Sequence, residues 1–214
     1  MTIKLKRRDF VQVAIVLIYV VIWIQIYNSI NEISTTSLRT ASFVPPLQKF
    51  PWLFQPWTGV IYFFGVFLSL ILPLFWNWSR RSFTLVMGAN AISSGIAFIT
   101  YLLWPVRMIR PDFQGPGPGL VLMRLCAAWD GPSNCFPSFH AILAVLCALL
   151  ITQHNIPKLL KAFCWTLAIA ICGSTITVGQ HYFMDVPAGI LTAIFGFYAA
   201  RWLLSRTPGK FEHL

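Results

Sequence analysis

The chain has 214 residues, of which 57% are hydrophobic and only 10% are charged, and its mean hydropathy is +0.70. A soluble domain carries about 25% charged residues, so this composition excludes an ordinary soluble protein and indicates an integral membrane protein. The net charge of +10 does not indicate a nucleic-acid partner, because the basic residues stand at the ends of apolar runs, as topology signals do. We expect one membrane-embedded domain over residues 1–214, surrounded by membrane lipids.

Six apolar runs are long enough to cross a bilayer, at roughly 20 residues per crossing. The predicted spans are about 10–29, 58–78, 83–104, 138–155, 159–179 and 186–204. The predicted fold is therefore all-α, a bundle of six transmembrane helices. The start resembles a signal peptide, but its apolar run from Phe10 to Tyr27 is longer than the usual hydrophobic region of about 7–15 residues, and no small-x-small site follows it. We interpret this run as a retained first helix.

The sixteen basic residues divide unevenly between the two sides of this arrangement. Eleven fall on one side: Lys4, Lys6, Arg7, Arg8, Arg80, Arg81, Lys158, Lys161, Arg201, Arg206 and Lys210. The other five are Arg39, Lys49, Arg107, Arg110 and Arg124. The positive-inside rule then predicts that both termini are cytoplasmic and that the 105–137 loop faces outward.

Two polar clusters interrupt the apolar pattern, and each contains a histidine. The first runs from Cys135 to His140 and the second from Gly179 to Asp185. Forty mostly apolar residues separate His140 from His181, enough for one crossing and a return, so both histidines should reach the same membrane face. On a helix, His181 and Asp185 would share a face, where the acid holds one imidazole nitrogen protonated and frees the other to attack. A surface polar pair at a helix start remains the alternative.

Further residues in the outer loop suit a phosphate group. Ser138 is a good N-cap for the 138–155 span, and the free N–H groups of a helix N-terminus bind phosphate. Arg107 and Arg110 offer planar, bidentate phosphate contacts, whereas Arg124 and Asp130 are more simply structural. Together these residues predict phosphoryl transfer through a covalent phosphohistidine, without a metal or a cofactor.

The loops and cysteines give weaker signals. The run Gly115-Pro116-Gly117-Pro118-Gly119 cannot be regular helix or central strand, so we expect 105–137 to be a loop. The aromatic residues of the 30–57 loop suit the membrane interface. Three cysteines in apolar runs are interpreted as core thiols, and a disulfide between Cys126 and Cys135 stays open.

Three short motifs occur in order along the chain: Arg110-Pro111, then Pro137-Ser138-Phe139-His140, then Ser174-Thr175 with five residues before His181 and three more before Asp185. They resemble the three-part signature of the type-2 phosphatidic acid phosphatase superfamily, which includes the vanadium haloperoxidases. The motif region covers about 101–189. The residues around His140 and His181 are similar to those of a bacterial branch of the superfamily that is related to the inositol phosphorylceramide synthases.

The resemblance implies a role for each matching position. His181 would be the nucleophile, Asp185 would orient it, and His140 would protonate the leaving oxygen. Ser138 would hold phosphate oxygens, and Arg110 would be the arginine of the first motif. The implied protein is a helical bundle in the inner membrane of a bacterium, with its active site at the outer, periplasmic surface and a lipid phosphate as substrate.

Three positions depart from the family pattern. Leu103 stands where the first motif usually has a lysine, Phe139 where the second has a glycine, and Thr175 where the third has an arginine. Either Arg107 and Arg124 compensate for the missing cations, with Thr175 in contact with the phosphate, or the substrate differs. A less cationic pocket suits a phosphodiester better than a phosphomonoester dianion, which keeps a head-group transferase open.

The predicted function is hydrolysis of a lipid phosphate or polyprenyl pyrophosphate, and the alternative is a lipid head-group phosphotransferase that uses the same intermediate. A transporter or proton relay is a weaker hypothesis, because the ionisable groups fall at the ends of the spans, and Gln25 and Asn90 are the strongest polar residues inside them. A scaffold with a decayed site is a further alternative. The sequence identifies neither the lipid nor the oligomeric state.

Overall fold

The computed structural model describes residues 7–34, 39–40, 50–71 and 79–206. Within these ranges the chain is helical apart from two short strands and the connecting loops. The helices are α1 (Arg7–Ser34), α2 (Gly59–Ile71), α3 (Arg80–Leu103), α4 (Pro118–Trp129), α5 (Phe139–Thr152), α6 (Lys158–Thr177) and α7 (Asp185–Ser205). Two 3₁₀ turns, η2 (Pro51–Leu53) and η3 (Pro56–Thr58), precede α2, and the strands are β1 (Arg39–Thr40) and β2 (Val106–Arg107).

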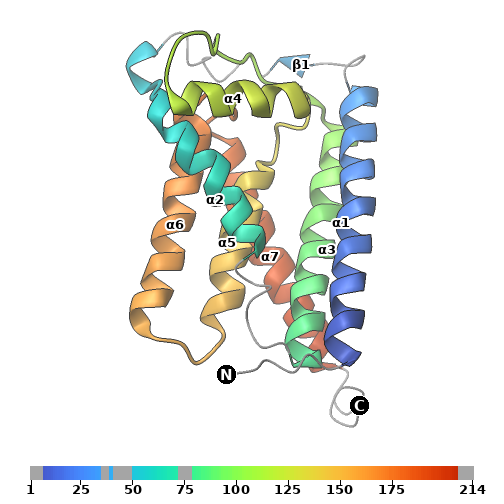
Figure 1. Ribbon diagram of the computed structural model, residues 1–214. Helices are drawn as coiled ribbons and strands as arrows, with labels where there is room; N and C mark the ends of the chain where they lie inside the picture. The colour runs from blue at the N-terminus through green and yellow to red at the C-terminus, as the bar shows by residue number, and fades with distance from the viewer. Residues whose placement is uncertain (1–6, 35–38, 41–49, 72–78, 207–214) are drawn as a thin grey trace.

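The helices form a bundle in which α4 lies across one end (Figure 1). The α3 helix packs on α7, α5 packs on both α6 and α7, and α1 packs on α3. The shorter α2 lies against α4, α5 and α6. The predicted all-helical bundle is therefore confirmed.

Four of the described helices are long and apolar enough to cross a membrane: Phe10–Ile33, Arg80–Leu103, Lys158–Thr177 and Asp185–Ser205. They correspond to four of the six predicted spans. The α5 helix has 14 residues and is shorter than the predicted span 138–155. The α2 helix has 13 residues, and the remainder of the predicted span 58–78 lies outside the described residues. The count of six spans stays a prediction.

The α5 helix forms the centre of the bundle. Ten of its 14 residues are buried, because helices α2, α3, α6 and α7 surround it. Small side chains let these helices approach closely. A Cβ atom at Gly196 of α7 would overlap the hydroxyl of Ser93 on α3, and one at Gly189 of α7 would lie 2.5 Å from the carbonyl oxygen of Ser138. The start of α7 is thereby held against the start of α5.

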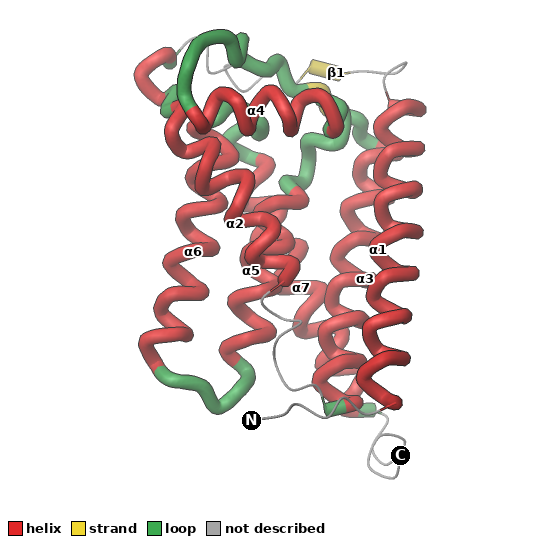
Figure 2. The backbone as a smooth tube through the Cα atoms, in the orientation of Figure 1, coloured by secondary structure: helices red, strands yellow, loops and turns green. Residues whose placement is uncertain are grey.

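The loop predicted for residues 105–137 contains a helix, so that prediction was wrong for 118–129. Figure 2 shows α4 among the loops that gather at this end. Pro118 occupies the first helical turn, where a missing N–H costs nothing, and Gly117 precedes it with a φ of 125° that suits glycine. Gly119 lies directly against the Pro56 carbonyl, where a Cβ would not fit. Strands β1 and β2 pair in parallel, with Arg39 opposite Val106 and Thr40 opposite Arg107.

The two ends of the bundle differ in charge. The first turn of α1, the last turn of α7 and the α5–α6 turn lie at one end, and α4 lies at the other (Figure 1). The basic residues of the described helix termini at the first end are Arg7, Arg8, Arg80, Arg81, Lys158, Lys161, Arg201 and Arg206. This arrangement follows the predicted segregation of charge. Which side of the membrane each end faces stays a prediction.

Candidate active site

The start of α5 positions the first histidine. Ser138 is the N-cap, as predicted, and its hydroxyl accepts a hydrogen bond of 3.3 Å from the backbone N–H of Ala141. The buried Tyr101 hydroxyl donates to the Pro137 carbonyl at 2.8 Å and fixes the residue before the cap. His140 then lies in the first turn of α5, beside the end of the bundle that α4 covers.

A tight turn positions the second histidine. Gly179 has a φ of 72°, and the Thr175 carbonyl accepts the backbone N–H groups of Gln180 and His181 at 3.0 and 3.1 Å. His181 therefore lies in the turn before α7, and Asp185 is the first residue of that helix. The two residues therefore do not lie on one helix, the case considered above for their i, i+4 spacing, although their side chains still contact each other.

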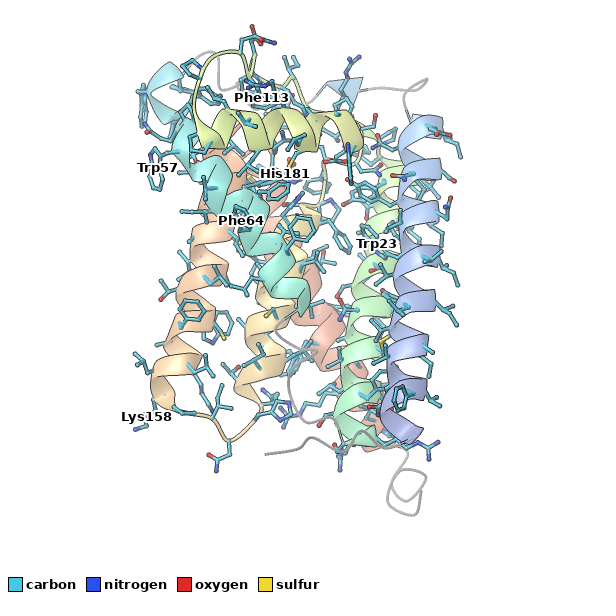
Figure 3. All side chains as sticks on the ribbon, in the orientation of Figure 1. Trp23, Trp57, Phe64, Phe113, Lys158 and His181 are labelled. Carbon is cyan, nitrogen blue, oxygen red and sulfur yellow. The ribbon has the colours of Figure 1, made fainter. Side chains whose placement is uncertain are left out.

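The structure brings the two histidines together beneath α4, where Figure 3 labels His181. Nδ1 of His140 lies 3.2 Å from Nε2 of His181. The Tyr62 hydroxyl lies 3.5 Å from the same His140 nitrogen, and the Tyr62 ring packs on the imidazole with centroids 4.4 Å apart. His181 is only 5% exposed, whereas His140 is half-buried.

The other nitrogen of His181 has two acceptors. Nδ1 lies 3.0 Å from the carbonyl oxygen of Cys135 and 3.4 Å from Oδ2 of Asp185. A carbonyl and a carboxylate can only accept, so we assign the hydrogen to Nδ1. Nε2 then carries the lone pair and faces His140, which is the form an imidazole nucleophile requires.

Cys135 supports the same acid with its side chain. Its thiol donates to Oδ2 of Asp185 at 2.8 Å, and the backbone N–H of Tyr182 donates to that oxygen at 2.7 Å. Burial, together with the negative charge of Asp185, raises the pKa of the Cys135 thiol well above its ordinary value. Cys126 and Cys135 are both free, so the disulfide left open above does not form in this structure. The Cys135 thiol instead stabilises Asp185.

The thiol of Cys135, Nδ1 of His181 and the Asp185 carboxylate lie within 4.8 Å of one another and are of the types that bind zinc. The hydrogen bonds described above use these same atoms. We therefore assign the three side chains to the orientation of His181.

A small pocket opens beside the two histidines. It is lined by Tyr27, Arg110, Asp130, Gly131, Pro132, Asn134, Cys135, Phe139, His140, Gln180 and His181. Arg110 enters it between two main-chain carbonyls, donating from Nη1 to Asp130 at 2.5 Å and from Nη2 to Gly131 at 3.1 Å. Nη2 also lies 3.2 Å from the Asp130 carboxylate. Burial raises the pKa of Asp130, while Arg110 and a hydrogen bond from Tyr27 oppose this rise.

Three residues predicted to bind phosphate do not line this pocket. The Ser138 hydroxyl caps α5, and the Thr175 hydroxyl donates to the Cys172 carbonyl at 2.8 Å. Arg107 is exposed on β2, and its carbonyl accepts from the Tyr182 hydroxyl at 3.1 Å. Their roles as phosphate ligands stay predictions. Arg124 donates to two main-chain carbonyls of the 113–115 loop, which is the structural role expected for it.

The sequence interpretation missed several residues of the site. Asn134 and Gln180 are polar residues directly beside the two motifs, and this adjacency was the available signal. Tyr27 and Tyr62 come from α1 and α2, far away in the chain, and nothing near them in the sequence marks them as part of the site.

Comparison with known proteins bears on the segment that carries both histidines. Residues 123–199 match the family model of the PAP2 superfamily. Among solved structures, the crystal structure of Aquifex aeolicus LpxE is similar, with a TM-score of 0.55, 17% sequence identity, and coverage of 77% of this chain and 99% of that chain. At this identity the likeness shows the fold alone. Curated proteins give no match. The finer likeness to the branch near the inositol phosphorylceramide synthases stays a prediction. The predicted resemblance of this chain to the PAP2 superfamily is confirmed.

Proposed function

We propose that the chain is a membrane lipid phosphatase that transfers the phosphoryl group of a lipid phosphate or polyprenyl pyrophosphate to His181 and then to water. The observation that carries this proposal is the contact of 3.2 Å between Nε2 of His181 and Nδ1 of His140, with the opposite nitrogen of His181 donating to Cys135 and Asp185. The match to the PAP2 superfamily supports a phosphatase, and the fold shared with LpxE is consistent with it.

In the first step, the lone pair on Nε2 of His181 attacks phosphorus. The P–N bond forms while the P–O bond to the lipid breaks, and protonated His140 gives its proton to the leaving oxygen. The imidazole ring of His181 gains positive charge in this step. The Asp185 carboxylate and the Cys135 carbonyl face the Nδ1–H of that ring and stabilise the charge.

In the second step, water attacks the phosphorus of the phosphohistidine. His140 accepts a proton from the water, the P–N bond breaks, and the bonding pair returns to Nε2 of His181. Arg110 lines the pocket and offers the positive charge that steadies the phosphate oxygens in both steps. We further propose that this end of the bundle faces the exterior of a bacterial inner membrane.

The test is phosphate release by the purified full-length protein from a panel of phosphatidate, polyprenyl pyrophosphate and phosphodiester lipids. We expect release from one of the first two, and we expect His181→Ala to abolish it. His154→Ala is the matched control, because His154 lies in the α5–α6 turn at the opposite end of the bundle. Release that survives in His181→Ala would refute the proposal. A new lipid product without free phosphate, formed only with an added alcohol, would make the protein a phosphotransferase.

A further inference from the structure

Three polar atoms around the pocket are buried without a hydrogen-bond partner: Nε of Arg110, Oδ1 of Asn134 and Nε2 of Gln180. All three residues line the same pocket beside His181. Asn134 and Gln180 are each only 4% exposed. Leaving a buried donor or acceptor unpaired costs about 1–3 kcal/mol, so three such atoms around one pocket need a partner, which is ordered water in the free site and a polar ligand when one binds.

The hydrogen-bonding character of these atoms follows from the rest of each side chain. The Asn134 amide nitrogen donates to the Tyr27 carbonyl at 2.9 Å, which leaves its oxygen as the free acceptor. Nη1 and Nη2 of Arg110 are already bonded to Asp130 and Gly131, which leaves Nε–H as a free donor. The unpaired atom of Gln180 is its amide nitrogen, a second donor. The unpaired atoms of the pocket are therefore two donors and one acceptor.

The charge of the pocket is close to zero before a ligand binds. Arg110 is its one cationic side chain besides the histidines, and it is paired with Asp130. The remaining titratable groups that face the pocket are the Tyr27 hydroxyl and the Cys135 thiol, which are neutral when protonated. Because the lining has no net charge, a dianion would bring two uncompensated negative charges into a buried site and a singly charged ligand only one, and each such charge is costly. A ligand with one negative charge suits this lining better.

We propose that this pocket recognises a singly charged phosphate group together with one O–H group, a proposal that rests on the function proposed above. Two phosphate oxygens accept hydrogen bonds from Nε of Arg110 and Nε2 of Gln180, and the O–H group donates to Oδ1 of Asn134. Gln180 thereby supplies a neutral contact in a site that lacks the family's lysine at Leu103 and its arginine at Thr175. The O–H group is either the proton of a monoester phosphate or a hydroxyl beside a phosphodiester.

The test measures binding alone, so it does not depend on whether the protein hydrolyses a lipid. The detergent-solubilised full chain is titrated calorimetrically at pH 6 with inorganic phosphate and with sulfate. The two anions have similar size and shape, but at this pH phosphate is mostly singly charged and carries O–H groups, whereas sulfate is a dianion without a proton. We expect phosphate to bind on the order of tenfold more tightly, the effect of one hydrogen bond to a buried acceptor.

Variants test which residues produce the preference for phosphate over sulfate. In Asn134→Leu the affinities for phosphate and sulfate should converge, and in Gln180→Leu both anions should bind several-fold more weakly. Gln180→Lys should raise the affinity for sulfate more than that for phosphate, and it keeps the test decisive if the leucine variants fold poorly. The control is Gln153→Leu, because Gln153 is exposed at the opposite end of the bundle. Wild-type affinities for both anions in folded Asn134→Leu and Gln180→Leu would overturn the proposal.

A second pair of probes identifies the source of the O–H group. Bis(2-hydroxyethyl) phosphate and dimethyl phosphate are both singly charged diesters, but only the first has hydroxyl groups. Tighter binding of the first, lost in Asn134→Leu, would assign the O–H group to a hydroxyl beside a phosphodiester. Discrimination between phosphate and sulfate alone would assign it to a monoester phosphate. If neither pair is discriminated, the proposal is wrong.

Discussion

Nδ1 of His181 lies 3.0 Å from the carbonyl oxygen of Cys135 and 3.4 Å from Oδ2 of Asp185, so the main-chain acceptor is the nearer one. The orientation and tautomer of His181 therefore do not depend on the carboxylate alone. A carbonyl has no charge, so the carboxylate remains the group that stabilises positive charge on the ring.

Because the Cys135 carbonyl and the Asp185 carboxylate have different roles, substitutions of Asp185 and His181 should have unequal effects. Asp185→Asn removes the charge but leaves the Cys135 carbonyl in place, so we expect kcat for phosphate release to fall on the order of 10²-fold. His181→Ala removes the nucleophile and should abolish release. Equal losses in the two variants would show that the carboxylate, rather than the Cys135 carbonyl, fixes the tautomer.

The Cys135 thiol is predicted to be unreactive in the folded protein. It is buried, and burial beside Asp185 raises its pKa, so little thiolate forms at pH 8. Iodoacetamide at this pH should modify Cys135 only after unfolding, as peptide mass spectrometry would measure. Because both Cys126 and Cys135 are free, a reductant should leave activity unchanged. Rapid native alkylation of Cys135, or a Cys126–Cys135 disulfide, would contradict this account.

The donor function of the same side chain is tested by two substitutions, one with a hydrogen-bond donor and one without. Cys135→Ser keeps an O–H donor for Asp185, whereas Cys135→Val leaves one hydrogen bond to a buried carboxylate unmade. We expect the valine variant to lose about 1–3 kcal/mol of stability and the serine variant to lose less. Thermal unfolding in detergent would measure the difference. Equal stability of the two variants would mean that the thiol contributes by packing alone.

Gly189 is predicted to set the distance between the two catalytic segments. Its added Cβ would lie 2.5 Å from the Ser138 carbonyl, so Gly189→Ala should push the start of α7, with Asp185, away from the start of α5, with His140. We expect activity to fall at least tenfold, since small displacements at a catalytic site are costly. Gly173→Ala on α6 is the matched control, because nothing lies within 4 Å of its added Cβ. A similar activity in both variants would contradict the prediction.

Arg110 and Arg124 make a second matched pair. Both donate to main-chain carbonyls, but only Arg110 lines the pocket. Lysine keeps the positive charge but lacks the planar guanidinium group that binds two phosphate oxygens. Arg110→Lys should therefore raise KM and lower kcat/KM by about tenfold or more. Arg124→Lys should loosen the 113–115 loop and leave KM near that of the wild type. A KM effect of the same size in both variants would place the function of Arg110 in the loop rather than in the pocket.

Much of the fold could be predicted because hydropathy is a property of local sequence. The four long helices follow the apolar runs closely, with α6 and α7 within two residues of the predicted limits at both ends. The α4 helix was missed because Pro118 and Gly119 argue against a helix interior, whereas both lie in its first turn. The α5 helix is central and enclosed, and its length is set by its neighbours as well as by its own composition.

The residues of the site could also be predicted only in part. His140, His181, Asp185 and the Ser138 cap were predictable, because spacing along the chain brought them to one end of the bundle. Tyr62 could not be predicted, since it reaches His140 only through the packing of α2 on α5. The role of Cys135 could not be predicted either, because its thiol meets Asp185 fifty residues away only in the folded chain.

The central claim is a covalent bond between phosphorus and His181, and trapping that bond tests it most directly. The purified protein is mixed with the ³²P-labelled lipid that it hydrolyses, quenched within milliseconds in alkali, and digested for mass spectrometry. We predict label on the peptide that contains His181, stable in alkali, lost in acid and absent from His181→Ala. Label on any other residue, or phosphate release that continues without a labelled protein under conditions that slow the second step, would contradict the account.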